Sequence, residues 1–264
     1  MDLRFFTRDH FPDLFGVWAE LKLVAAINID GWDKSRIDAF RKSCEEGEVV
    51  CKIPGAGVKK SDECHVALIS RSETLVSRLE GPYLDNDVRA HGKLLGYPAC
   101  CIDAWQSGVE AQQNELISSV IKKSKSPSSY LNIFSVGNRL IPHSPCSLDC
   151  EKSHELSKLT LKKLKEVDSE KAAQVKQDLN LPVLVKDSQI FLKFKKTDQG
   201  LEFKWIEDQR PYLNGYVTRL SEANDKNLHQ IGTSFAQLWN KRGGFPNGEP
   251  FSEFHWIDWK KTIQ

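Results

Sequence analysis

The chain has 264 residues, of which 40% are hydrophobic and 28% are charged, and its formal net charge at pH 7 is +1. This composition is typical of a soluble globular protein, and the length allows one large domain or two small ones. The near-neutral charge argues against a protein whose main role is to coat nucleic acid, and no apolar run is long enough to predict a membrane span.

Residues 1–84 predict a small region of mixed α/β structure. The apolar stretches 21–29, 48–53 and 65–69 have the composition of strands. Helical periodicity over residues 32–44, and again around Leu75 and Leu79, predicts a helix after the first strand and another after the third.

Residues 85–180 predict a helical region. Segments 86–95 and 101–122 have helical character, and residues 146–180 have the periodicity of one long amphipathic helix. Ser144 and Pro145 would supply the cap and the first-turn proline of that long helix.

Residues 181–264 predict a β-rich region. Ile190, Leu192 and Phe194 alternate with polar residues before a turn at 197–200, and a second alternating run follows, which is the pattern of a β-hairpin. A helix is expected near residues 227–240. The aromatic residues between 245 and 259 are expected in the core, with a stacking wall for a planar substrate as the alternative. The predicted fold is therefore α+β, with a helical centre, a mixed N-terminal part and a hairpin-containing C-terminal part.

The chain contains seven cysteines, an odd number that does not suit a disulfide framework. Residues 1–10 lack the apolar core and cleavage site of a signal peptide. We therefore expect a cytoplasmic protein with reduced cysteines, which leaves metal binding, catalysis, or burial as small apolar side chains.

Two cysteine motifs carry the strongest chemical signal. Cys100 and Cys101 follow a Gly-x-Pro helix start, while Cys146, Cys150 and His154 recur every four residues. In a helix that recurrence places three metal-capable side chains on one face, about 6 Å apart along the axis. Thiols at helix N-termini ionise more readily, as metal ligands must. We predict that the two helix beginnings face each other and hold an iron centre between them.

The donor set permits more than one centre. An iron–sulfur cluster ranks first, because four cysteines are enough for a cubane and three would leave one iron open to a substrate. Zn²⁺ ranks second, with His143 or His154 able to complete a site. Adjacent Cys100 and Cys101 are awkward for tetrahedral zinc, because both sulfurs rarely point the same way from a helix. A thiol–disulfide relay ranks third.

Several other side chains are candidates for the same pocket. His91, His143 and His154 could move protons, since the pKa of an unperturbed histidine lies near neutrality. Arg89 could bind a carboxylate or phosphate, and a surface salt bridge is its structural alternative.

The sequences Leu-Gly-Tyr-Pro-x-Cys-Cys at residues 95–101 and Ile-Pro-His-x-Pro-Cys-Ser-x-x-Cys at residues 141–150 resemble the paired motifs of an uncharacterised, largely helical "domain of unknown function" family of prokaryotic proteins. The resemblance covers residues 87–159. It implies that the four cysteines act as a set, and it implies no reaction.

These observations favour an iron–sulfur enzyme that acts on a small molecule by redox or sulfur-transfer chemistry. The alternatives are a non-catalytic module, stapled by zinc, that binds RNA or protein through its lysine runs, and a metal-free dithiol redox enzyme. The sequence leaves the substrate and the oligomeric state open.

Overall fold

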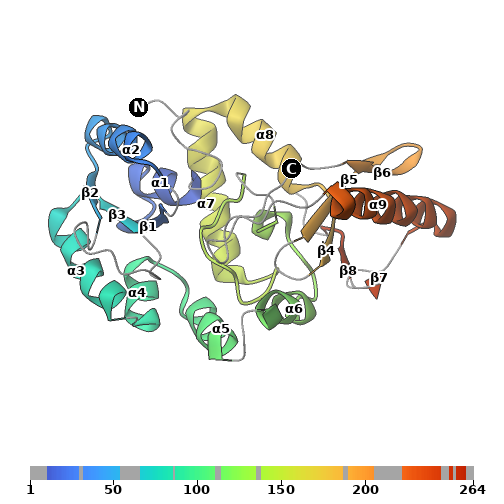
Figure 1. Ribbon diagram of the computed structural model, residues 1–264, viewed down its shortest axis with the longest axis horizontal. Coiled ribbons are helices and arrows are strands. Elements are labelled where there is room, and N and C mark those ends of the chain that lie inside the picture. Colours follow the sequence, from blue (N-terminus) through green and yellow to red (C-terminus); the bar gives the residue numbers. More distant parts are fainter. Residues whose placement is uncertain are drawn as a thin grey trace.

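The structure is a computed structural model that describes residues 11–29, 32–53, 66–85, 87–110, 114–134, 138–186, 190–204, 222–244, 250–251 and 254–259. Helices and two antiparallel sheets make up these residues, so the predicted α+β fold is confirmed (Figure 1). No helix within the described ranges combines the length and the apolarity needed to cross a membrane.

The first sheet has the order β1-β3-β2 and is antiparallel throughout. Its strands and the helices around it are α1 (Phe11–Trp18), β1 (Val24–Asn28), α2 (Lys34–Glu46), β2 (Val50–Lys52), β3 (Val66–Ser70) and α3 (Glu73–Leu84). Successive residues of β1 face opposite sides of the sheet: Ile27 packs with Phe40 of α2, and Val24 packs with Leu79 of α3. The three strands and two helices predicted for this region are confirmed, and α1 was not predicted.

The second sheet has the order β6-β5-β4-β8-β7 and is also antiparallel. Its elements are β4 (Val183–Lys186), β5 (Ile190–Thr197), β6 (Gly200–Lys204), α9 (Glu222–Arg242), β7 (Pro250–Phe251) and β8 (Phe254–Ile257). The predicted hairpin is β5–β6. Gly200 is required at its turn, because it has a φ of 127° and a Cβ there would collide with the side-chain amide of Asn240.

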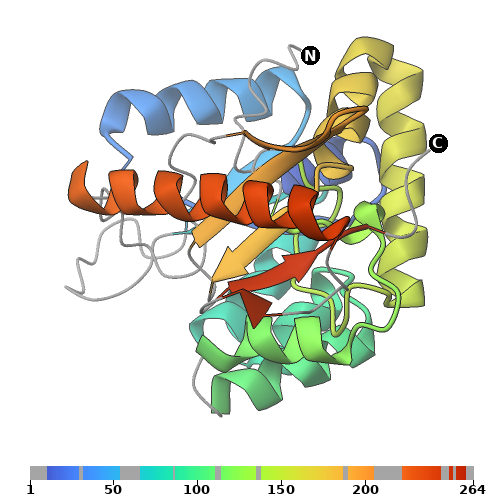
Figure 2. The same cartoon turned by 90° about the vertical axis from the view of Figure 1, so that its right-hand side faces the viewer.

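Helices cover both faces of this second sheet. Figure 2 shows α9 lying across one face, where Leu184 and Trp256 join the core with Phe235 of α9. On the other face Val183 packs with Val120 of α6 (Asn114–Lys123). The helix expected near 227–240 is therefore confirmed, and the described aromatic side chains of the C-terminal group belong to the core, namely Phe254, Trp256 and Trp259.

The predicted long helix over residues 146–180 is wrong at its start and in its middle. Two helices form instead, α7 (Glu151–Val167) and α8 (Ser169–Leu179). The chain before residue 151 stays irregular because it hydrogen-bonds to the loop after α6: Leu148 N–H donates to Ser124 Oγ (2.6 Å), and the Asp149 carboxylate accepts from two backbone N–H groups of that loop. At Asp168 the backbone is extended, and the carboxylate caps α8.

Helices α7 and α8 pack against each other, and Figure 2 shows them side by side along one edge of the molecule. Phe15 of α1 is fully buried against Leu161 and Leu164 of α7 and Val175 of α8. The N-terminal and central parts of the chain therefore share a hydrophobic cluster. The region boundaries expected at 84/85 and 180/181 stay predictions.

Candidate metal centre

The start of α5 (Ala99–Glu110) positions the first cysteine pair. Gly96, with a φ of 75°, turns the chain after α4 (Val88–Leu94), and the Pro98 carbonyl accepts the first helical hydrogen bond, from Cys101 N–H at 2.9 Å. The predicted Gly-x-Pro helix start is thus confirmed. Cys100 and Cys101 both fall in the first helical turn, where unpaired backbone N–H groups favour negative charge.

The second pair, Cys146 and Cys150, lies at the start of α7, but the two residues are not on one helix as predicted. Cys150 is the N-cap residue of α7, and its carbonyl accepts from His154 N–H at 2.9 Å. Cys146 lies in the preceding loop, so Cys146 and Cys150 do not share a helical face. The expectation that Ser144 and Pro145 begin this helix is wrong, for the reason given by the loop contacts above.

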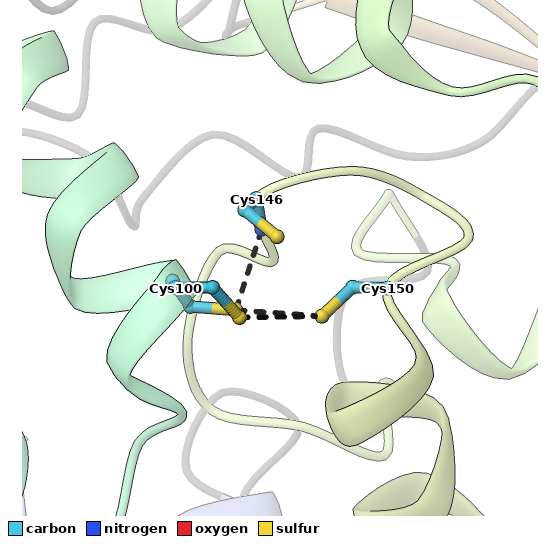
Figure 3. Close-up of side chains that lie close together, drawn as sticks. Cys100, Cys146 and Cys150 are labelled. Carbon is cyan, nitrogen blue, oxygen red and sulfur yellow. Dashed lines mark hydrogen bonds between the residues drawn. The ribbon is translucent and has the colours of Figure 1, made fainter.

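The four sulfur atoms converge, and Figure 3 shows those of Cys100, Cys146 and Cys150 pointing toward one another. The Sγ–Sγ distances are 3.9 Å for Cys100–Cys101, 3.9 Å for Cys100–Cys150 and 3.8 Å for Cys101–Cys150. Cys146 completes the group: all four sulfurs lie within 4.8 Å of one another, a spacing that could hold a metal ion. The two helix beginnings therefore face each other as predicted.

Burial differs among the four thiols. Cys101 is 3% exposed and Cys150 is 7% exposed, so both lie in the interior, with Leu131 and Ile141 around them. Cys146 is half-buried and Cys100 is exposed. The group therefore opens to solvent on the side of Cys100.

The ionisations of the four thiols are coupled to one another. Hydrogen bonding from Cys101, followed by hydrogen bonds from Ser153, lowers the pKa of Cys150 to about 4. The Cys150 interaction and burial raise the pKa of Cys101 well above that of a free thiol. Burial, followed by Cys150, raises the pKa of Cys146 to about 12. The first thiolate forms easily, and its negative charge opposes the ionisation of the next thiol. A bound cation would compensate the negative charge of several thiolates.

Of the predicted histidines, His143 is linked to the cysteines through the side chain of Ser153. It is 7% exposed, its Nε2 lies 2.9 Å from Ser153 Oγ, and its ring stacks at a tilt on Tyr97 with centroids 4.9 Å apart. Burial, followed by the charges of Lys22 and Arg139, lowers the pKa of His143 to about 3. His143 is therefore neutral and contacts the cysteines through Ser153.

The other predicted histidines are not among the metal-capable residues found in the described part of the chain. His154 meets Tyr130 edge-on, with ring centroids 4.8 Å apart, and it is outside the metal-capable group found among the described residues. Burial, followed by the charge of Lys22, lowers the pKa of His91. Arg89 pairs with Asp103 at 2.7 Å, and both side chains are about half exposed. This contact is the salt bridge named as the structural alternative, and it links α4 to α5.

Sequence reasoning missed two features beside the group. Ser153 is fully buried, and its hydroxyl lies 3.3 Å from Cys101 Sγ. Its position three residues after Cys150, in the first turn of a helix, was a usable signal. Lys22 pairs with Asp13 at 2.6 Å and lies over the Tyr97 ring at 5.1 Å from the centroid. No local pattern in the sequence indicated that contact.

Comparison with known families gives one match. Residues 59–180 match the family model described as "Protein of unknown function (DUF483)". This match confirms the resemblance to an uncharacterised family that the paired motifs indicated. The DUF483 segment contains all four converging cysteines together with His143 and Ser153. No curated protein and no solved structure matches the chain.

Proposed function

We propose that the chain is a metal-binding protein whose four cysteines hold a single tetrahedral ion, with Zn²⁺ as the first candidate. The supporting observation is the spacing of the sulfurs, because three Sγ pairs lie 3.8–3.9 Å apart. A tetrahedral ion with metal–sulfur bonds of about 2.3 Å holds its ligands about 3.8 Å apart. Four thiolates suit Zn²⁺ and also a single iron ion.

The same spacing ranks a single ion above the iron–sulfur cluster favoured by the sequence. A cluster distributes its cysteines over several iron atoms and so separates their sulfurs further. The sequence-based objection to zinc was that the sulfurs of Cys100 and Cys101 would diverge. At 3.9 Å they are at the separation that one tetrahedral ion requires.

A bound ion would join segments that are distant in the sequence. It would tie the start of α5 to the start of α7 and to the loop that carries Cys146. These segments also surround a small hydrophobic cluster with Leu131 and Ile141 at its centre. Since the ligands are not gathered in an unfolded chain, the free energy of metal binding would contribute to folding.

An enzyme that acts on a small molecule is the second candidate. It is supported by the exposure of Cys100, which leaves one ligand position accessible to a solute, whereas a purely structural zinc site is closed by four protein ligands. The predicted redox or sulfur-transfer chemistry, a metal-free dithiol relay, and a stapled module that binds RNA or protein all remain alternatives to be separated by experiment.

Metal analysis of the full chain, purified without oxygen, tests the proposal. We expect one zinc ion per chain and a colourless protein. One iron per chain without acid-labile sulfide would retain the single-ion site and change the metal. Several irons with an equal amount of sulfide, and absorbance near 400 nm, would overturn the single-ion site in favour of a cluster.

Matched variants test which cysteines are responsible. Cys101→Ser removes a central ligand, and we expect it to lower the metal content strongly. Cys44→Ser is the control, because Cys44 is equally buried but belongs to the hydrophobic core of the first sheet. A chain without bound metal, or equal metal content in the two variants, would contradict the proposed function.

A further inference from the structure

Ser153 occupies a bridging position beside the cysteines. Its side chain is fully buried, and its Oγ lies 3.3 Å from Cys101 Sγ on one side and 2.9 Å from His143 Nε2 on the other. The backbone N–H of Cys146 also points at Cys101 Sγ, at 3.4 Å. Two hydrogen-bond donors can therefore converge on Cys101, and Ser153 also hydrogen-bonds to the neighbouring Cys150.

The direction of the hydrogen bonds follows from the chemistry of the three groups. A metal-bound thiolate can only accept, so the Ser153 hydroxyl must donate to Cys101 Sγ. The Ser153 oxygen then has lone pairs left to accept from His143 Nε2–H. This arrangement leaves the second ring nitrogen, Nδ1, without its proton.

The surroundings of His143 agree with this tautomer. Among the described residues, Nδ1 of His143 is buried and finds no hydrogen-bond partner. A buried N–H without an acceptor costs more free energy than an unused lone pair, so the proton belongs on Nε2. Tyr97 stacks on the ring and holds its orientation.

We infer that Ser153, oriented by His143, is a positioning residue of the metal centre: its hydroxyl donates to the Cys101 thiolate and stabilises the metal-bound form of the site. The inference rests on the proposed function, because it concerns the same four cysteines. Four thiolates around a divalent ion carry excess negative charge, and a buried donor at Cys101 offsets part of it. Hydrogen bonds of this kind to ligands raise metal affinity by about 10- to 100-fold.

The chain contains a matched control on the same helix. Ser157 is also fully buried, one turn further along α7, and its hydroxyl donates to the Ser153 carbonyl at 2.9 Å rather than to a cysteine. Ser153→Ala and Ser157→Ala therefore remove the same atom from neighbouring buried sites. His143→Gln keeps an N–H donor near Ser153, and His143→Phe removes it.

The experiment measures transfer of Zn²⁺ from the full-length protein to a chromogenic chelator, together with the absorption spectrum of the Co²⁺-substituted protein. We expect Ser153→Ala to lower the zinc affinity at least about tenfold and to move the sulfur-to-cobalt charge-transfer band to lower energy. His143→Phe should do the same to a lesser degree. Ser157→Ala should match the wild type in both readouts, and His143→Gln should lie close to it.

The outcomes separate this inference from the proposed function. Wild-type protein that binds neither Zn²⁺ nor Co²⁺ would overturn the proposed function and the inference with it. Wild-type protein that binds metal, with Ser153→Ala equal to Ser157→Ala in affinity and spectrum, would overturn the inference alone. A spectral shift confined to Ser153→Ala, with none in His143→Phe, would overturn the orienting role of His143. Far-UV circular dichroism of each variant shows that the comparison is between folded proteins.

Discussion

The sulfur atoms of Cys101 and Cys150 lie 3.8 Å apart, although 49 positions separate the two residues in the chain. A metal ion bound between them would stabilise the native fold only, because an unfolded chain does not bring these sulfurs together. We expect a chelator that removes the ion to lower the free energy of unfolding by about 4 kcal/mol when the free metal had been at about 1,000 times its dissociation constant. Thermal unfolding with and without chelator measures the change.

Cys101→Ser provides the control for that measurement. The variant should unfold at the same temperature with and without chelator, whereas Cys44→Ser should retain the full response of the wild type. A chelator effect of equal size in Cys101→Ser would place the stabilising ion elsewhere in the protein.

Metal binding should release protons at neutral pH. In the metal-free protein, the hydrogen bond from Cys101 lowers the pKa of Cys150 to about 4, so we expect one thiol of the group to ionise ahead of the others. Cys101 and Cys146 still carry their protons, because both have raised pKa values. Zn²⁺ binding at pH 7 should therefore release at least two protons, and its affinity should fall as the pH falls. Calorimetric titrations in buffers of different ionisation enthalpy count the protons, and a value near zero would contradict four-thiolate coordination.

The group of four cysteines shows which contacts a sequence can predict. The position of Cys100 and Cys101 follows from local chemistry, a Gly-x-Pro turn that starts a helix. The start of α7 was misjudged because the decisive hydrogen bonds, at Leu148 and Asp149, come from the loop after α6, more than twenty residues away. Periodicity alone contains no information about such distant partners.

The same limit applies to the groups around the centre. Lys22 lies over the ring of Tyr97, far along the chain, and it also passes close to Gly16, where a Cβ would approach Lys22 Cδ to 2.8 Å. By contrast, the alternation along β5 and the turn at Gly200 predicted the hairpin correctly, because neighbouring residues determine both.

The ion pair of Lys22 and Asp13 should be strongly cooperative. The two side chains are only 5% and 9% exposed and lie 2.6 Å apart, so either charge without its partner would be buried and uncompensated. We expect Lys22→Met or Asp13→Asn alone to cost about 3–5 kcal/mol, and the double variant to cost clearly less than the sum. A double-mutant cycle from urea unfolding measures the coupling. Additive costs would show that the pair is not a coupled buried interaction.

Arg89 and Asp103 form the exposed counterpart in that comparison. Their side chains are about half exposed and lie 2.7 Å apart, so the same cycle should give at most about 1 kcal/mol of coupling. Arg89→Ala should also leave the metal content unchanged, unless Arg89 binds an anionic ligand as the sequence suggested.

The buried imidazole of His143 should make the protein sensitive to mild acid. Burial, followed by the charges of Lys22 and Arg139, lowers its pKa in the folded state from 6.5 to about 3. Below pH 6.5 this histidine is therefore protonated in the unfolded chain but not in the folded chain. The free energy of unfolding consequently decreases as the pH falls, until the pH reaches about 3. Between pH 7.5 and 5.5 this single group should lower the free energy of unfolding by about 1 kcal/mol.

His143→Gln removes the titration and keeps a donor toward Ser153. We expect the variant to lose about 1 kcal/mol less than the wild type between pH 7.5 and 5.5, in urea unfolding at constant ionic strength. Zinc content must be measured at both pH values, because release of the ion at the lower pH would also destabilise the fold. If both proteins keep their metal and show the same pH dependence, the imidazole is protonated in the native state. In that case a protonated His143 would donate to Ser153, and the inferred donation from Ser153 to Cys101 would not depend on a neutral histidine.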